Sequence, residues 1–278
     1  ATLDTAIGWI EDAGMAVVVD LHIINAHHFN ASNDEGKNTL FTDPASQEHL
    51  ADLWRELSSR LDKWGNDFLA YEILNEAVAD DLGDWNHLIN KCISAVRELE
   101  PGRPIVVGSN RWQHAQTFPY LRVPLDDPNL ILSYHFYEPF PFTHYRTGWV
   151  GAYSAYDGPM QYPGRLLSEE QLAELPDGRI KEMLAENLGP HSRSSMRRRM
   201  LPAIEYARLH DLPLYCGEWG CFKTVDRDDM LQWYGDMRAI LSLEGVQDAI
   251  WDYKGGFHIV NPQTGAADHE LIRTVAPQ

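Results

Sequence analysis

Two glutamates lie at the carboxyl ends of short apolar segments of the sequence. Glu76 comes after the run FLAYEIL and Asn75, and Glu218 ends the run PLYCGE. Hydrolysis of a glycosidic bond needs one carboxylic acid to protonate the leaving oxygen and a second carboxylate opposite the anomeric carbon. Each glutamate by itself could form an ordinary ion pair with an arginine. Together, and with Asn75 beside one of them, the two glutamates favour a catalytic pair.

The elements that must position these glutamates are predicted by alternating patterns of hydrophobicity. The predicted strands cover residues 15–21, 68–74, 104–108, 129–137, 213–218 and 246–253. The predicted helices cover residues 47–64, 85–99, 112–118, 196–210, 230–244 and 268–275. Nearly continuous apolar strands that alternate with amphipathic helices indicate a parallel sheet buried on both faces.

Polar and aromatic side chains at the strand ends distinguish between two parallel-sheet folds. They are Asp20, His22, Asn75, Glu76, Ser109, Asn110, His135, Tyr137, Glu218, Trp219, Trp251 and Asp252. In a barrel the carboxyl ends of all strands meet at one mouth, whereas in an open sheet the sites gather at one switch point. The sequence also lacks the glycine-rich fingerprint of nucleotide-binding open sheets. We therefore predict an α/β fold, the (β/α)8 TIM barrel.

The number of predicted strands is smaller than a complete barrel requires. Six strands are predicted, and a helical pattern at residues 3–13 precedes the first of them. That helix would normally follow a strand. We expect the chain to be a single glycoside hydrolase catalytic domain over residues 1–278, truncated at its N-terminus, with strands three to eight of the barrel present.

Composition limits the classes of partner. The chain has 278 residues, a formal net charge of -18, nine tryptophans and twelve tyrosines. A polyanion repels phosphate backbones, so we expect no nucleic acid, and no apolar run is long enough for a membrane helix. Many flat aromatic rings suit a neutral sugar chain. The three cysteines (Cys92, Cys216 and Cys221) are expected to be reduced and packed, and the protein to be a monomer.

The order of these strand-end residues along the chain resembles the motif pattern of glycoside hydrolase family 5, the cellulase family of the retaining (β/α)8 clan. In that family an Asn-Glu pair ends strand four, as Asn75-Glu76 does here, and the nucleophile ends strand seven, as Glu218 does. The remaining matches are His22 at strand three, His135 and Tyr137 at strand six, and Trp251 at strand eight. One dipeptide is a weak signal, but ordered matches on five separate strands are a specific one.

The resemblance implies roles for the two carboxylates and for the residues around the nucleophile. Glu218 would be the nucleophile and Glu76 the general acid/base. Tyr137 would donate its hydroxyl to Glu218 and so keep that carboxylate charged and aimed. His135 would brace the catalytic pair and bind the sugar at the cleavage site.

The resemblance also implies which residues hold the sugar. Asn75 would hydrogen-bond its 2-hydroxyl group, a contact that tightens in the transition state. His22 would bind other hydroxyl groups, although a buried core histidine is the alternative at that position. Trp251 would form the floor beneath the sugar.

Three further tryptophans are candidates for additional substrate contacts. Trp149 lies in a Gly/Pro-rich insertion at residues 138–163, Trp112 follows the predicted strand at 104–108, and Trp219 is next to Glu218. Long loops at a barrel mouth commonly set specificity. The alternative is that some of these rings only pack the loops against the barrel.

The sequence departs from the family pattern in two places. The family has an arginine at the end of strand two that supports the nucleophile, and no residue here can be assigned that role. His27 and His28 come later than the second histidine of the family, so which of them contacts substrate stays open. Asp20 and the three histidines could in principle bind zinc, but their spacing fits no common zinc motif. We expect no metal and no cofactor.

The expected activity is that of a retaining β-glycanase, and most specifically an endo-β-1,4-glucanase that acts on β-glucan by double displacement. A β-mannanase or an exo-acting β-glucosidase of the same family would share this chemistry. A carbohydrate-binding barrel without catalytic activity is the alternative from another class, and it would have no need of paired carboxylates. A secreted or periplasmic location would suit such an enzyme, and no signal region is present in this chain.

Overall fold

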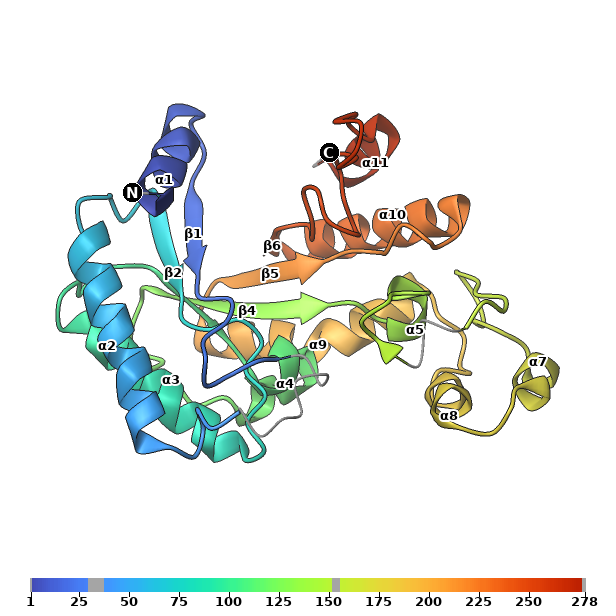
Figure 1. The fold of residues 1–278 in the computed structure, drawn as a ribbon, viewed down its shortest axis with the longest axis horizontal. Coiled ribbons are helices and arrows are strands. Elements are labelled where there is room, and N and C mark those ends of the chain that lie inside the picture. Colours follow the sequence, from blue (N-terminus) through green and yellow to red (C-terminus); the bar gives the residue numbers. More distant parts are fainter. Residues whose placement is uncertain (1, 30–37, 152–155, 277–278) are drawn as a thin grey trace. The chain divides into compact units, whose positions relative to one another are not determined.

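The computed structural model describes residues 2–29, 38–151 and 156–276, which fall into two compact units (Figure 1). The first unit comprises Ala1–Tyr134 and Glu205–Tyr215, and the second comprises His135–Ile204 and Cys216–Gln278. Three elements, β4 (Leu130–Phe136), α9 (Arg193–His210) and β5 (Leu214–Trp219), continue from one unit into the other.

Parallel strands form the centre of the first unit. Beside β4 it contains β1 (Val17–Asp20), β2 (Leu69–Glu72) and β3 (Ile105–Gly108). Val17 pairs with Leu69, Tyr71 with Ile105, and Ile105 with Leu130. The backbone N–H of Leu132 donates to the carbonyl of Pro213 at 2.9 Å, immediately before β5. The predicted parallel strands are therefore confirmed here, and β1 to β4 are each shorter by one to three residues than the predicted strand.

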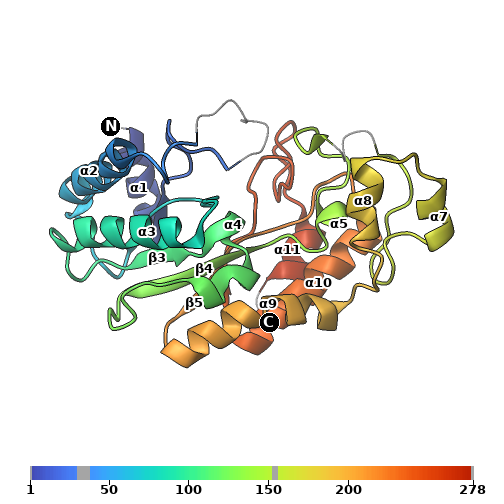
Figure 2. The ribbon, with the colours of Figure 1, turned by 90° about the horizontal axis from the view of Figure 1, so that it is seen from below.

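Helices of the first unit cover these strands. They are α1 (Thr2–Asp12), α2 (Pro44–Leu61), α3 (Leu82–Arg97), the short α4 (Asn110–Gln113) and the 3-10 helix η2 (Ala115–Tyr120). The carboxylate of Asp43 accepts hydrogen bonds from two backbone N–H groups in the first turn of α2, with Pro44 directly after the cap. Both features are strong helix-start signals. Helices α2 and α3 pack side by side (Figure 2).

The core of the first unit combines large apolar side chains with one buried ion pair. Trp54 and Tyr71 are fully buried and their rings lie 5.2 Å apart. Arg103, only 1% exposed, donates to Glu100 at 2.8 Å and to the carbonyl of Leu69 at 2.8 Å. Tyr71 donates its hydroxyl to the same Glu100 carboxylate at 2.8 Å. A buried charge is tolerated when it is paired and fully hydrogen-bonded in this way.

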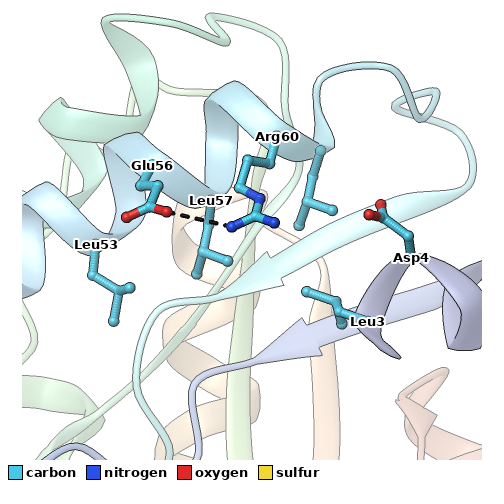
Figure 3. A pocket seen from close by; sticks show the side chains of 7 residues that line it. Leu3, Asp4, Leu53, Glu56, Leu57 and Arg60 are labelled. Atoms are coloured by element: carbon cyan, nitrogen blue, oxygen red, sulfur yellow. Dashed lines mark hydrogen bonds and ion pairs between the residues drawn. The ribbon is translucent and has the colours of Figure 1, made fainter. Parts of the chain in front are cut away.

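A pocket of about 190 Å³ lies between α1 and α2 (Figure 3). Its lining consists of Leu3, Asp4, Leu53, Glu56, Leu57, Arg60 and Leu61. Arg60 donates to Glu56 at 3.4 Å on its rim. None of the residues predicted to take part in catalysis lines this pocket.

The second unit contains further helices and the last strand. Its elements are α5 (Phe140–Thr143), α7 (Glu169–Glu174), α8 (Arg179–Ala185), α10 (Arg227–Glu244), β6 (Gln247–Asp248) and α11 (His269–Val275). The strands are hydrogen-bonded in sequence order from β1 to β6, as expected for successive β-α units. The short helices α7 and α8 were not predicted.

The last predicted strand is much shorter than expected. Residues 246–253 were predicted, but β6 contains only Gln247 and Asp248. The chain nevertheless stays beside β5, because Ala249 donates to the carbonyl of Cys216 and Trp251 to that of Trp219, both at 3.0 Å. The segment keeps single contacts to β5 without a regular ladder, which explains why its strand pattern overestimated its length.

All three cysteines are free thiols in the interior, as the sequence predicted. Cys221 accompanies Trp219, Trp233 and Tyr234 in the core of the second unit. Burial raises the pKa of its thiol well above the usual value, because the charged thiolate would be desolvated. Among the described helices, none has the length and apolar character needed to cross a membrane.

Candidate active site

Asn75 and Glu76 lie on the segment that follows β2. Two backbone hydrogen bonds tie this segment to the end of β1: Leu21 donates to the carbonyl of Glu72 at 3.2 Å, and Asn75 to that of Leu21 at 3.1 Å. Asn75 is 2% exposed, and the half-buried Glu76 has a positive φ of 47°. This left-handed conformation is unusual for a residue with a side chain, so its surroundings must hold it.

His22 follows β1 and keeps an accessible imidazole. Its Nδ1 lies 2.8 Å from Oδ2 of Asp20, and its side chain is 36% exposed. The edge of its ring meets Phe29 at a centroid distance of 5.3 Å. A carboxylate that accepts a hydrogen bond from an imidazole nitrogen fixes the orientation of the ring.

His27 is a core residue of the first unit. It is 1% exposed, and its ring packs edge-on against Phe41. Burial lowers the pKa of His27 to about 4, because the charged imidazolium would be desolvated. Of the two histidines whose substrate contact the sequence left open, His27 is therefore unsuited to that role.

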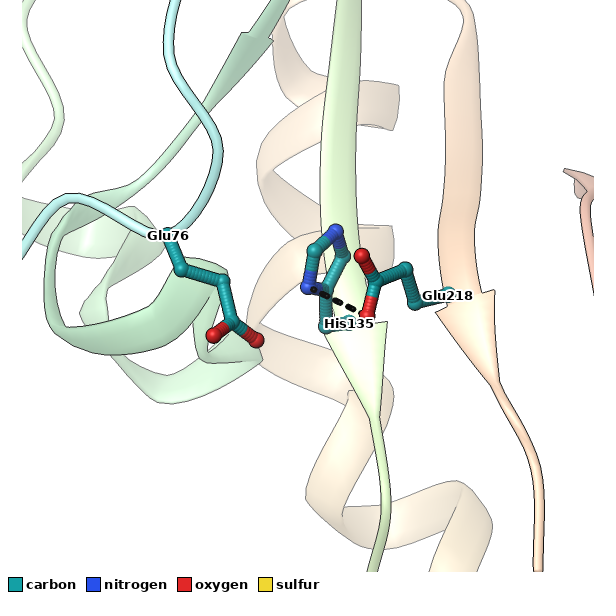
Figure 4. A group of neighbouring side chains, drawn as sticks. All are labelled: Glu76, His135 and Glu218. Atoms are coloured by element: carbon teal, nitrogen blue, oxygen red, sulfur yellow. Dashed lines mark ion pairs between the residues drawn. The ribbon is translucent and has the colours of Figure 1, made fainter. Parts of the chain in front are cut away.

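Glu218 is held by two residues from the end of β4. The hydroxyl of Tyr137 donates to Oε2 of Glu218 at 2.8 Å. Nδ1 of His135 lies 3.6 Å from the same oxygen (Figure 4), and the two side chains are 3% and 13% exposed. A hydrogen-bond donor directed at a nearly buried carboxylate favours its charged form and fixes its orientation.

Tyr137 is itself fixed from behind by residues that the sequence did not single out. Thr143 donates its hydroxyl to the carbonyl of Tyr137 at 2.5 Å. The phenol ring contacts His144 and Phe257 at centroid distances of 5.1 and 5.7 Å. His144 is buried and stacks on Phe140 at 3.9 Å. Burial lowers the pKa of His144 to about 3, so this imidazole is neutral at ordinary pH.

Trp251 is anchored next to β5 through its backbone. Its N–H donates to the carbonyl of Trp219 at 3.0 Å, and its own carbonyl lies so close to Gly220 that a Cβ there would approach it to 2.3 Å. Gly220, the second glycine of the motif CGEWG, is therefore required for this close approach. The indole of Trp251 is partly exposed, as a sugar platform must be.

The three other predicted tryptophans differ in accessibility. Trp149 is 45% exposed, and its ring contacts Phe222 edge-on at 5.2 Å. Trp112 is 44% exposed and donates its indole N–H to the carbonyl of Phe29 at 2.7 Å. Nearly half of each residue is therefore accessible to a ligand. Residues 152–155 of the insertion that carries Trp149 lie outside the described residues.

Trp219 does not fit the substrate-binding role predicted for it. Its side chain is 0% exposed, packs against Trp233 and Tyr234, and donates to Asp248 at 3.0 Å. A strand alternates its side chains between two faces, so the neighbour of Glu218 points away from it into the core. Proximity in sequence to Glu218 was therefore a misleading signal for substrate contact.

Gln113 is a further residue that the sequence did not indicate. Its amide oxygen accepts a hydrogen bond from the backbone N–H of Glu76 at 2.9 Å. The only signal in the sequence is Gly108, where a Cβ would lie 2.2 Å from Cγ of Gln113. That signal cannot be interpreted without knowing which residue approaches the glycine.

The comparison with protein families decides the class of this protein. The model of the cellulase family, glycosyl hydrolase family 5, matches residues 1–256. The chain belongs to glycoside hydrolase family 5. It is therefore an enzyme of the class that hydrolyses O-glycosyl bonds, and its fold is that of a (β/α)8-barrel family, as predicted.

Relatives of this family 5 chain match most of its length. It is 29% identical to endoglucanase C of Acetivibrio thermocellus over 275 residues, which are 99% of this chain and 78% of that protein. It is 27% identical to cellodextrinase A of Ruminococcus flavefaciens over 248 residues, which are 88% of this chain and 64% of that protein.

Solved structures agree on the fold. The cellobiose complex of Thermotoga maritima Cel5A matches with a TM-score of 0.78 at 20% identity, over 99% of this chain and 77% of that one. Cellulose synthase subunit Z of Clostridioides difficile matches with a TM-score of 0.78 at 21% identity, over 99% of this chain and 78% of that one. At this level of sequence identity, the similarity supports a common fold and nothing beyond it.

Proposed function

We propose that this family 5 chain is a retaining endo-β-1,4-glucanase with Glu218 as nucleophile and Glu76 as general acid/base. The observation that supports the proposal most directly is the pairing of Glu218 with Tyr137 at 2.8 Å. A carboxylate that accepts a phenolic hydrogen bond at the end of a strand is charged and aimed, which is what a nucleophile needs. The relatedness to endoglucanase C over 99% of the chain favours a cellulosic substrate.

The proposed reaction has two displacements. In the first, Oε of Glu218 attacks the anomeric carbon while Glu76 donates its proton to the glycosidic oxygen, and the aglycone departs. In the second, Glu76 takes a proton from a water molecule, which attacks the same carbon and releases Glu218. Two inversions at one carbon give a product with the configuration of the substrate.

In this proposal, residues that the family motifs identify after the strands bind the sugar at the cleavage position. Asn75 is assigned to the 2-hydroxyl group and His22 to other hydroxyl groups, with Asp20 fixing the imidazole. Trp251 supplies the apolar floor, and the exposed rings of Trp149 and Trp112 extend the contacts to further sugars. Flat exposed rings suit the C–H faces of glucose units.

A second candidate activity is the cleavage of short cellodextrins. It is favoured by the 27% identity to a cellodextrinase over 88% of this chain. The chemistry at Glu218 and Glu76 would be the same, and the two activities differ in how long a chain the site accepts.

The decisive experiment uses dinitrophenyl cellobioside with the wild-type chain, Glu218→Ala and Glu76→Ala. We expect Glu218→Ala to be inactive and Glu76→Ala to retain cleavage of this activated substrate, whose leaving group needs little acid assistance. Azide should accelerate Glu76→Ala and yield the β-glycosyl azide, whereas azide with Glu218→Ala should give the α-anomer. Equal losses in both variants without any azide product would contradict the assignment.

The substrate is then defined with polymers. A soluble cellulose derivative, a mannan and a set of cellodextrins are compared by viscosity and by reducing ends. An endoglucanase lowers the viscosity of the cellulose derivative after few cleavages, whereas a cellodextrinase releases sugars from short chains and barely changes viscosity. Binding of cellodextrins without any hydrolysis would instead support a carbohydrate-binding barrel.

A further inference from the structure

The segment that contains α4 has a backbone conformation that residues with side chains rarely adopt. Arg111, Trp112 and Gln113 are consecutive, and their φ angles are 56°, 61° and 52°. Each of them lies in the left-handed region, where a Cβ is crowded by the neighbouring backbone. Strain of this kind persists only where surrounding contacts fix it, and such places are commonly functional.

Several hydrogen bonds tie this turn to the segment after Glu76. Asn110 forms a two-way pair with the backbone of Ala79, because its amide donates to the carbonyl and accepts from the N–H, both at 2.9 Å. The N–H of Trp112 donates to the carbonyl of Ala77 at 3.2 Å. The turn after β3 is thus bonded to the residues that immediately follow the proposed acid/base.

Gln113 is the residue that this turn presents to Glu76. It is 1% exposed, and its Oε1 accepts from the N–H of Glu76 at 2.9 Å. Its Nε2 donates to the buried carboxylate of Glu72 at 3.0 Å and to the hydroxyl of Ser133 at 3.0 Å. A carboxylate accepts and an N–H donates, so these partners allow only one orientation of the amide.

The two groups that accept hydrogen bonds from the amide nitrogen of Gln113 belong to strands of the sheet. Glu72 is the last residue of β2, and Ser133 lies in β4 opposite Gly108 of β3. The absence of a side chain at Gly108 leaves the space that Cγ of Gln113 occupies. Gln113 therefore connects three strands of the parallel sheet to the left-handed backbone of Glu76, whose φ is 47°.

We propose that Gln113 is a positioning residue for Glu76: it fixes the backbone from which the acid/base carboxyl extends, and so determines how well that carboxyl reaches the leaving oxygen. The inference rests on the proposed function, in which Glu76 is the proton donor. A misplaced general acid harms those substrates whose leaving group needs a proton and spares those whose leaving group does not.

The test measures kcat/KM of the 278-residue chain for aryl cellobiosides, from phenyl to dinitrophenyl. Gln113→Met keeps the length of the side chain and removes its polar contacts. We expect a loss of about 10- to 100-fold on the phenyl substrate and less than about threefold on the dinitrophenyl substrate. Gln116→Met places the same change on an exposed glutamine three residues later and should match the wild type.

A charge-exchange pair protects the test against simple misfolding of Gln113→Met. Gln113→Glu alone places two carboxylates about 3 Å apart and should be strongly impaired. Adding Glu72→Gln restores a donor to that pair and leaves an acceptor for the N–H of Glu76, so the double variant should regain the leaving-group dependence of the wild type. Failure of the double variant to regain it would overturn the proposal.

Two outcomes separate this inference from the proposed function. If Glu76→Ala shows a steep dependence on the leaving group but Gln113→Met loses activity equally on all substrates, Gln113 is only structural and the inference is wrong. If Glu76→Ala itself shows no such dependence, the acid/base assignment is wrong and the inference falls with it.

Discussion

The hydroxyl of Tyr137 and the carboxylate of Glu218 are 2.8 Å apart, although the two residues are more than eighty positions apart in sequence, one directly after β4 and the other in β5. The phenol has few alternatives, since its backbone carbonyl is bonded to Thr143 and its ring is packed against His144 and Phe257. The donor is thus fixed before substrate binds. Fixed donors directed at a reacting charge lose no energy in reorganisation during the reaction.

Removal of this donor should slow the reaction on every substrate. Tyr137→Phe keeps the ring packing and deletes the hydrogen bond to Glu218, so we expect kcat/KM to fall about 10- to 100-fold whatever the leaving group. Steady-state kinetics on activated and unactivated cellobiosides measures this. Tyr206→Phe is the matched control, because it removes a hydroxyl that donates to the carbonyl of Leu121. Full activity of Tyr137→Phe would show that Glu218 does not depend on this bond.

Trp149 should contribute to the binding of long substrates. Trp149→Ala removes an indole that is 45% exposed, and we expect KM to rise on soluble cellulose polymers while hydrolysis of aryl cellobiosides changes little. Trp9→Ala provides a control, because Trp9 is a 69% exposed indole on α1. If Trp149→Ala leaves polymer kinetics unaltered, the ring only packs against Phe222.

The buried ion pair of the first unit should be important for stability. Arg103→Leu leaves Glu100 buried without its cation, and we expect the free energy of unfolding to fall by about 3–5 kcal/mol. Replacing both residues with leucine should recover part of that loss. Arg60→Leu, which breaks the exposed pair with Glu56, should cost less than about 1 kcal/mol. Urea unfolding followed by tryptophan fluorescence compares the variants, and equal effects at both pairs would contradict the argument.

Acidification should destabilise the fold through its buried histidines. The pKa of His144 is lowered to about 3 in the folded state, while the unfolded chain binds this proton near pH 6.5. Because the unfolded chain binds this proton more readily than the folded protein, protonation of His144 favours unfolding. The free energy of unfolding therefore carries no such penalty above about pH 6.5, and it decreases as the pH falls from 6.5 toward 3. Stability at pH 7.5 and 4.5 is to be measured for the wild type, His144→Phe and His87→Phe.

We expect His144→Phe to lose less stability than the wild type between these two pH values. Phenylalanine takes up no proton in either state, and it can keep the stacking on Phe140. The exposed His87 serves as control, and its variant should follow the wild type. An equal loss in all three proteins would show that His144 does not cause the acid sensitivity.

The sequence by itself was sufficient for those features that depend on local pattern. Apolar runs and helical spacing predicted β1 to β5 and the long helices, because each of these elements buries a face that is visible in its own residues. The same runs placed Glu76 and Glu218 at strand ends. The family motifs named Tyr137 as the partner of Glu218, and the two are hydrogen-bonded.

The tertiary structure decided what depends on partners from distant segments. Trp219 is of a residue type that often binds sugars, but it packs against Trp233 and Tyr234 of α10 and lies in the core. Gln113 gave no sign of its contact with Glu76, since the left-handed turn that presents it is stabilised by bonds to residues more than thirty positions away. Burial and backbone strain are set by the sum of such long-range contacts, and no local pattern records them.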